Sequence, residues 1–287
     1  MTVRFPHLAQ RVVNVPLAIH PGKAEVIIAA LAERLGVSHL FGEAGRPVAL
    51  MPMMTEIEAE PARGYEVLGG VAIIPVEGTL VAKLGTLCPY SGMTGYDGIR
   101  VNFLTALADD AVRAIVLDID SPGGECSGLF DLVDTIIAAR GIKPIRAILT
   151  EVAFSAAYAI ASAADRISVP RTGGVGSIGV VCMHVDWSRA LTEAGATVTM
   201  IRFGERKFEG NQYEPLSRSA RAAIQADVDA AGMLFVETVA RNRGLSVASI
   251  AKTEAATFLG PAGVLLRLAD AVEAPDEALR TLFADLE

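Results

Sequence analysis

Several residue types are scarce in this chain, and each scarcity excludes a class of protein. The three cysteines, Cys88, Cys126 and Cys182, have no CxxC spacing and leave one over, so we expect neither a disulfide framework nor a zinc site. Charged residues make up only 20% of the chain and hydrophobic residues 52%, which indicates a globular rather than a disordered protein. We expect a reducing compartment, no metal and no cofactor.

The chain also lacks a surplus of positive charge and a long apolar run. Its formal net charge of −8 argues against a nucleic-acid partner, because such proteins concentrate Lys and Arg to neutralise phosphates. The first 20 residues contain no uninterrupted apolar region followed by a cleavage site, so they do not indicate a signal peptide. The most apolar stretch, residues 152–164, is too short to cross a bilayer. We therefore expect a buried helix there and no membrane span.

Hydrophobic periodicity predicts one α/β domain behind an appendage. Residues 1–66 are interpreted as an N-terminal appendage and linker with an amphipathic helix around 23–35, and residues 67–287 as the main domain with a helical C-terminal segment. Short β-branched runs alternate with helical spacing, which is typical of a parallel sheet buried on both faces. The expected strands are 69–78, 113–120, 144–150, 166–170, 177–182 and 197–203, with none after them. The expected helices are 95–107, 126–140, 155–165, 187–195, 217–244, 246–252, 261–269 and 275–286.

The first motif that suggests chemistry is the run from Asp120 to Gly124, DSPGG, at the end of a predicted buried strand. Ligands of open α/β sheets gather at the carboxyl ends of strands, and paired glycines let backbone N–H groups approach a bound oxygen. Gly123 and Gly124 are therefore candidates for an oxyanion hole. The same residues also suit a strand-to-helix turn without a function.

The second motif places Ser155 at the start of an alanine-rich helix that follows a predicted strand. The free N–H groups and positive dipole end of a helix N-terminus favour a developing oxyanion, so this is a position for a nucleophile. A serine at a helix start is more often a plain N-cap. The motif alone leaves both interpretations open.

A serine nucleophile needs a base, and the sequence offers two kinds. His184 follows a predicted strand, and Asp186 or Asp165 could orient it in a Ser-His-Asp triad. Lys207 lies in a loop rich in glycine and polar residues, where it would need burial to lose its charge at neutral pH. From composition alone, Lys207 is a solvated loop charge and His184 a surface or core residue.

A series of stretches, in order, resembles peptidase family S49, whose best-known members are the signal peptide peptidase A proteins of bacterial membranes. The stretches are VAIIPVEGTL, IVLDIDSPGG, SAAYAIASAADRI and GGVGSIGV, followed by the loop with Lys207. The resemblance runs from about residue 69 to about residue 270. It implies a Clp protease/crotonase-like α/β fold of repeated ββα units with a mainly parallel sheet.

The resemblance also implies roles for individual residues. Ser155 matches the family's nucleophile and Lys207 its general base, which together form a Ser-Lys dyad. Ser177, in the GSIGV stretch, matches the serine that hydrogen-bonds the lysine amine and orients it.

The oxyanion hole of the family corresponds to Gly123 and Gly124, with help from the backbone at Ala156. One departure is visible, because Ala156 and Ala157 stand where the family has glycines after the nucleophile. This change narrows the pocket, so the family's substrate preference does not carry over.

Two further stretches, HLAQRVVNVPLAIHPGKAEVI and PYSGMTGYDGI, resemble the head-maturation proteases of lambda-type tailed phages, the minor capsid protein C group. That resemblance implies a serine endopeptidase that cleaves scaffold, portal or other capsid proteins, and itself, during procapsid maturation. It also implies a location in the host cytoplasm, inside the procapsid. The Clp protease/crotonase-like fold implies a homo-oligomer, in which different subunits can contribute catalytic residues. The membrane relatives usually carry an anchor, and none is predicted here.

Three other functions remain as alternatives. The chain could be a signal-peptide-peptidase-like protease with another class of substrate. It could be a crotonase relative that binds acyl-CoA, although no acidic catalysts and no basic pocket for the CoA phosphates are evident in the sequence. It could also be a structural capsid component that kept a protease fold without activity.

Overall fold

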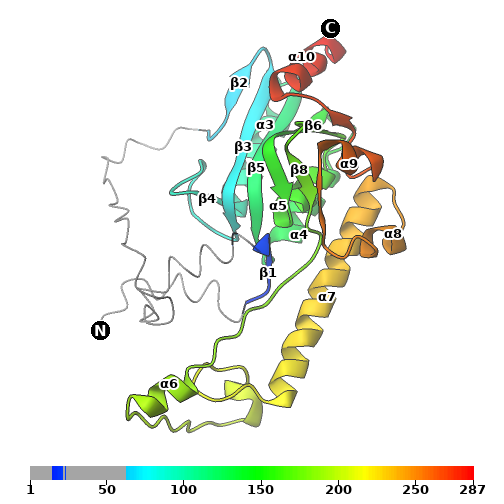
Figure 1. The fold of residues 1–287 in the computed structure, drawn as a ribbon. Coiled ribbons are helices and arrows are strands. Elements are labelled where there is room, and N and C mark those ends of the chain that lie inside the picture. Colours follow the sequence, from blue (N-terminus) through cyan, green and yellow to red (C-terminus); the bar gives the residue numbers. More distant parts are fainter. Residues whose placement is uncertain (1–14, 22, 24–62) are drawn as a thin grey trace, which may run out of the picture.

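A computed structural model describes residues 15–21, 23 and 63–287. Figure 1 shows a twisted sheet packed against helices, and one long helix that leads away from the sheet to a separate lobe. The helix predicted around residues 23–35 lies almost wholly outside the described residues. Within the described ranges, no helix is both long enough and apolar enough to cross a membrane.

Four parallel strands form the centre of the sheet and confirm the predicted α/β class. They are β3 (Val71–Val81), β5 (Ala114–Glu125), β6 (Ile145–Phe154) and β7 (Arg166–Val169), in the spatial order β7-β6-β5-β3. Their apolar side chains are mostly buried, as expected for parallel strands covered on both faces. The shorter strands are β1 (Leu17–Ile19), β2 (Glu66–Leu68), β4 (Met93–Gly95), β8 (Gly174–Gly176), β9 (Thr257–Leu259) and β10 (Ala271–Val272).

Helices cover both faces of the sheet. On one face lie α3 (Tyr96–Ala108), α4 (Leu129–Ile137) and α5 (Ala156–Ser162), whose apolar side chains share the main core with β3, β5 and β6. On the other face α10 (Pro275–Asp285) forms a smaller core with the same strands through Ala278 and Leu282. Every residue of α5 is buried, because small alanine side chains let this helix lie close to the sheet. The sheet is therefore the middle of three layers.

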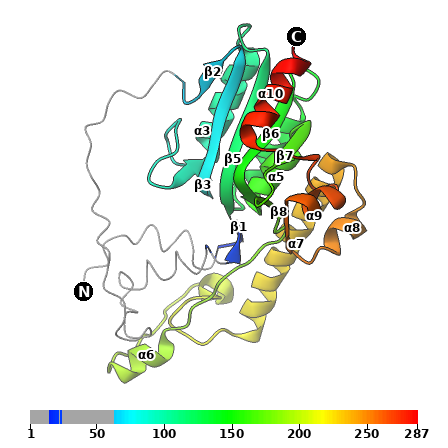
Figure 2. The same ribbon diagram turned by 45° about the horizontal axis from the view of Figure 1, so that its top comes forward.

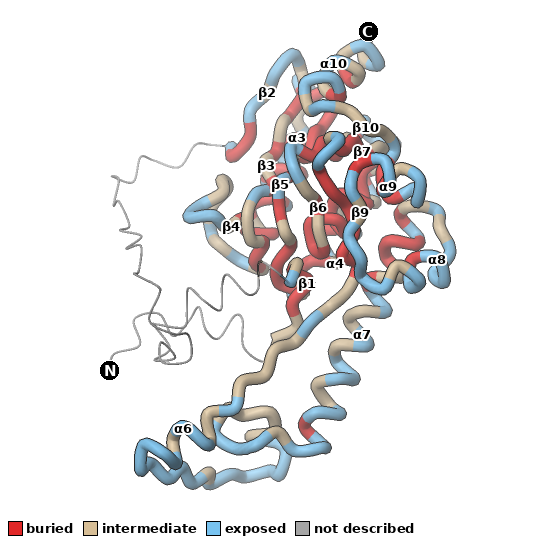
Figure 3. Tube along the Cα trace, viewed as in Figure 1, coloured by how far each residue is buried: buried red, intermediate tan, exposed pale blue. Residues whose placement is uncertain are grey.

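The long helix α7 (Arg218–Arg243) connects this body to residues 183–217, which we call the arm. The helix begins at Ser217, whose Oγ accepts a hydrogen bond from the Ala220 N–H, and ends at Gly244 in the left-handed conformation, as predicted. The arm contains only α6 (Ser188–Glu193) and the 3-10 turn η2 (Glu205–Phe208). No residue of the arm is buried, which Figure 3 shows as a pale, unburied lobe at the far end of α7.

Three strand predictions are wrong. Residues 177–182 form no strand beyond an isolated bridge at Val181, and residues 197–203 in the arm are irregular. Both runs are β-branched and apolar, but strand formation depends on a neighbouring edge more than on propensity, and the arm offers none. Strands also do not stop after residue 203, because β9 pairs with β8 and β10 pairs with β7.

The C-terminal helices α8 (Val247–Ala251) and α9 (Gly260–Leu265) form near their predicted positions.

The DSPGG motif is no strand-to-helix turn, because β5 continues through it to Glu125 while pairing with β3 and β1. The division at residues 66 and 67 stays a prediction; β1, from the predicted appendage, pairs with the main sheet.

Candidate active site

Ser155 lies at a sharp junction between β6 and α5. Its φ of 56° and ψ of −120° are unusual for a residue with a side chain, and its N–H is held by the carbonyl of Gly176 at 2.9 Å. Such strained backbone gathers at functional sites, and a strand-turn-helix junction is how α/β hydrolases present a nucleophile. The Oγ forms no cap bond with α5, so the plain N-cap alternative is wrong. Instead, the Oγ points to the carbonyl oxygen of Gly179, at 3.5 Å.

The paired glycines lie beside this junction. A Cβ placed on Gly123, whose φ is +99°, would lie 2.9 Å from the Cβ of Ser155, so Gly123 lies directly beside Ser155. A Cβ on Gly124 would lie 1.8 Å from the carbonyl oxygen of Leu80 in β3. Both positions therefore require glycine for a close approach of backbone.

Ser121 is a residue of this site that the sequence motif contained but that received no predicted role. Its side chain is fully buried, its Oγ donates to the carbonyl of Gly78 at 2.6 Å, and the same oxygen accepts the N–H of Gly123 at 3.1 Å. Ser121 thus fixes the segment that carries the glycines. In the sequence, the signal for this role was a serine just before two glycines at the end of a predicted buried strand.

Ser177 belongs to the neighbouring wall of the site. It is 5% exposed, has a φ of 54°, and donates its N–H to the carbonyl of Ala256 at 2.9 Å. The carbonyl of Gly176, one residue earlier, holds the N–H of Ser155. The structure therefore brings Ser155, Gly123 and the segment around Ser177 together. Ala156, fully buried at the start of α5, follows Ser155 directly.

Lys207 is placed elsewhere. It lies in η2 of the arm with an exposed side chain, and Figures 1 and 2 show that lobe well away from α5. One chain alone therefore does not bring Lys207 to Ser155. The arm also contains His184 and Asp186; hydrogen bonds from Ser188 lower the pKa of Asp186, with a smaller effect of His184.

Asp165, the other candidate for orienting a histidine, lies beyond the opposite end of α5. Its carboxylate accepts the N–H of Ile145 at 2.8 Å and lies near Arg140. Since Ser155 is at the start of α5, the length of that helix separates Asp165 from Ser155. The described residues thus do not assemble a triad with Asp165.

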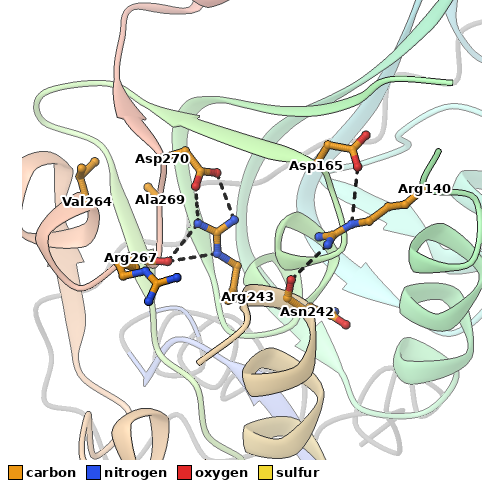
Figure 4. Close-up of a pocket in the computed structure, with 8 residues that line it drawn as sticks. All are labelled: Arg140, Asp165, Asn242, Arg243, Val264, Arg267, Ala269 and Asp270. Carbon is orange, nitrogen blue, oxygen red and sulfur yellow. Dashed lines mark hydrogen bonds and ion pairs between the residues drawn. The ribbon is translucent and has the colours of Figure 1, made fainter. Parts of the chain in front are cut away.

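A polar pocket of about 350 Å³ occupies that opposite end (Figure 4). The guanidinium of Arg140 donates to the carbonyls of Ser162, Ala163 and Ala164 at 2.9, 2.9 and 2.6 Å, which are the unsatisfied carbonyls at the end of α5. Burial lowers the pKa of Arg140, and Asp165 opposes that effect. Arg140 is therefore a cap that holds the helix carrying Ser155.

A second set of polar contacts in the same pocket joins α7 to its neighbours. Arg243 forms an ion pair with Asp270 at 2.6 Å and donates to the carbonyl of Arg267 (Figure 4), while the amide of Asn242 donates to the Oγ of Ser162 at 3.0 Å. Burial alone would lower the pKa of Arg243, but its hydrogen bonds to Asp270 raise it above the ordinary value. These contacts tie α7 to α5 and to the segment before β10.

The sequence of this chain is similar to those of several known proteins. The family model "Peptidase family S49" matches residues 138–286. The head-tail preconnector protein GP5 of Enterobacteria phage P21 is 40% identical over 98% of this chain, and the capsid assembly protease C of Escherichia phage lambda is 37% identical over 97%. The alignments cover 58% and 65% of those proteins, so the chain spans about three fifths of their length.

Solved structures are less similar. A membrane-bound stomatin-specific protease in complex with a substrate peptide aligns with 77% of this chain and 80% of its own, at 15% identity and a TM-score of 0.45, too low to add to the assignment. The sequence relatives are sufficient, because they extend along almost the whole chain at up to 40% identity. The resemblance noted in the sequence is confirmed, and the chain belongs to peptidase family S49.

Proposed function

We propose that this chain is a serine endopeptidase with a Ser-Lys dyad, in which Ser155 is the nucleophile and Lys207 the general base. The observation that carries the proposal is the junction at Ser155, where a buried serine is held at positive φ beside Gly123 and is not used as a helix cap. Membership of family S49 supports the same activity.

The proposed reaction is acyl transfer to Ser155. Its Oγ attacks the peptide carbonyl carbon while its proton passes to the neutral amine of Lys207, which then gives a proton to the leaving amine. Water hydrolyses the resulting ester in the reverse sense. Backbone N–H groups of Gly123, Gly124 and Ala156 stabilise the oxyanion, for which the N–H of Gly123 must leave the Oγ of Ser121 that it now contacts.

In this proposal the base comes from a neighbouring copy of the chain. A lysine acts as a base only when its amine is neutral, which requires burial, and the side chain of Lys207 is exposed in one chain. Docking of the arm on a second copy would supply that burial. Ser177, beside the nucleophile, would then accept a hydrogen bond from the amine and orient it.

Apolar side chains on the arm support such docking. Ile201 is 91% exposed and Phe203 is fully exposed, and both lie shortly before Lys207. Large apolar side chains gathered at one exposed site mark an interaction surface rather than a stable monomer surface. A homo-oligomer in which the arm reaches the next subunit would bury them together with the lysine.

The proposed substrates are capsid, scaffold and portal proteins, and the chain itself, during phage procapsid maturation inside the host cell. This part rests on the names of the relatives, a capsid assembly protease and a head-tail preconnector protein.

The test combines single variants with mixing. Wild type, Ser155→Ala, Lys207→Ala and the control Arg202→Ala, which removes an exposed arm charge, are each incubated with candidate scaffold and portal proteins, and intact masses are read. We expect cleavage by wild type and Arg202→Ala, and loss of at least about a thousandfold in the other two.

Mixing the two inactive variants tests where the base comes from. If each site takes its serine from one chain and its lysine from another, an equal mixture regains about a quarter of the sites. No recovery, with assembly unchanged by light scattering, would show that the base acts within one chain. Cleavage that survives Lys207→Ala would overturn the dyad and direct attention to His184.

A further inference from the structure

The strand β1 lies in a slot between two backbone edges at the active site. It pairs antiparallel with the end of β5, with Ala18 opposite Gly124 and Ile19 opposite Gly123. On its other side, Leu17 exchanges two hydrogen bonds with Val181, at 2.8 and 2.9 Å. Figures 1 and 2 both place β1 at the edge of the body from which the arm departs.

The slot leads to the nucleophile. A Cβ placed on Gly123 would lie 2.3 Å from the carbonyl oxygen of Ala18 and 2.9 Å from the Cβ of Ser155, so both of these atoms lie close to the same point. The ring of His20 stacks on Phe154, the residue before the nucleophile, with ring centroids 5.1 Å apart. The backbone N–H of His20 donates to the carbonyl of Pro122 at 2.8 Å.

A substrate needs this same slot. A peptide that presents a carbonyl to Ser155 and to the N–H groups near Gly123 must lie extended along the end of β5, where main-chain pairing provides affinity. One edge of a strand pairs with only one partner at a time. Since β1 already uses that edge and the facing edge at Val181, a substrate and β1 exclude each other.

We propose that residues 17–19 are a built-in competitor that occupies the substrate slot and must leave before a peptide is cleaved. The proposal rests on the proposed function and adds its regulation. It also identifies a substrate class: an extended peptide with a small residue at the place of Ala18, which is fully buried in the main core, between aliphatic neighbours like Leu17 and Ile19.

Two variants of the full chain release the competitor by different means. Leu17→Pro removes the N–H that donates to Val181, and Ala18→Arg introduces a side chain for which the core has no space. The control Pro21→Ala changes an exposed residue just outside the strand. The readout is the rate at which a fluorophosphonate labels Ser155, mapped by peptide mass spectrometry.

We expect Leu17→Pro and Ala18→Arg to be labelled at least about tenfold faster than wild type and Pro21→Ala. Leu17→Pro loses a hydrogen bond of the strand directly, and Ala18→Arg loses strand hydrogen bonds because its side chain forces the strand out of the slot. The free peptide VPLAIHP, added to Leu17→Pro, should slow labelling back toward the wild-type rate. Equal rates in all four proteins would overturn the competitor while leaving the nucleophile established.

A binding measurement keeps the test independent of catalysis. Fluorescent VPLAIHP is titrated into Ser155→Ala and into the double variant Leu17→Pro/Ser155→Ala, and anisotropy is followed. Binding to the double variant alone supports the competitor, whether or not the fluorophosphonate labels any protein. Absence of labelling in every protein would overturn Ser155 as the nucleophile, not the competitor. Equal binding, or none, to both variants would contradict occupation of the slot by β1.

Discussion

The body around the sheet and the arm differ in how much of their geometry one chain determines. In the body, Ser155 is fixed by a hydrogen bond to Gly176 and by complete burial of α5. In the arm no residue is buried, and only one short helix and one 3-10 turn interrupt irregular chain. The proposed nucleophile is therefore preorganised within one subunit, whereas the proposed base lacks, within one subunit, the burial that it needs.

The same contrast appears in the ion pairs. Arg140 and Arg243 lie in the body, where their guanidinium groups also satisfy carbonyls at helix ends. Arg189 pairs with Glu193 in the arm, with 91% of the arginine side chain exposed. Exposed pairs contribute little to stability because water and salt screen them. Substitutions in the two regions should therefore have very different effects.

The largest difference should come from one glycine in each region. Gly124→Ala places a Cβ 1.8 Å from the carbonyl oxygen of Leu80, which is backbone and cannot move aside, whereas Gly195→Ala in the arm meets nothing within 4 Å. We expect a loss of about 4 kcal/mol in the free energy of unfolding for Gly124→Ala, and about 1 kcal/mol for Gly195→Ala from its positive φ. Urea denaturation measures both. Similar losses would mean that the arm is packed as tightly as the sheet.

The next effect concerns the cap on α5. Arg140→Ala leaves three helix-end carbonyls without their donor, so we expect the free energy of unfolding to fall by about 3 kcal/mol and Arg140→Lys to restore part of it. Arg189→Ala is the matched control and should change stability by less than about 0.5 kcal/mol. A small loss of unfolding free energy for Arg140→Ala would show that water replaces the guanidinium, and that the pocket does not hold α5 in place.

The smallest effect depends on pH. Burial opposes ionisation of Asp270, but hydrogen bonds from Arg243 keep its pKa below the ordinary value. A depressed pKa adds stability that is fully present above the unfolded value of about 3.9 and is lost as the pH falls through the folded value. We expect Asp270→Asn to cost about 1–2 kcal/mol at pH 7 and progressively less below about pH 4.

The control for that measurement is Asp276→Asn, which removes an exposed carboxylate paired with Arg280 on α10. It should change the unfolding midpoint little at either pH, because solvent screens the pair. A constant difference between wild type and Asp270→Asn across the acid range would show that the loss comes from packing rather than from the charge.

Local patterns predicted the parts of the fold whose contacts are close in sequence. The alternation of strands and helices from β3 to α5, the position of Ser155 at a helix start, and the extent of α7 up to Gly244 all follow from periodicity and termination signals. The strands expected at 177–182 and 197–203 did not form, since apolar β-branched residues do not by themselves reveal whether a partner edge exists.

The site was predictable as a set of residue types but not as an arrangement. The sequence order gave candidates for the nucleophile and the oxyanion donors, and the structure places Gly123 so near Ser155 that a Cβ on Gly123 would lie 2.9 Å from the Cβ of Ser155. The sequence could not show that Lys207 lies on a lobe remote from Ser155 and Gly123, because that position depends on the direction of α7. Nor could it show the pairing of β1, a three-residue strand whose partners Gly124 and Val181 are over a hundred positions away.

The length of α7 has one more consequence. At about 1.5 Å per residue, the 17 residues from Arg218 to the one before Phe235, where the helix enters the main core, hold the arm roughly 25 Å from the body. On the proposed arrangement this helix is a spacer that sets the distance between neighbouring nucleophiles. Encounter between two chains then limits the reaction, so the rate rises with the square of the concentration when chains are dilute. Confinement of many copies in a small volume would act as the switch that turns the enzyme on.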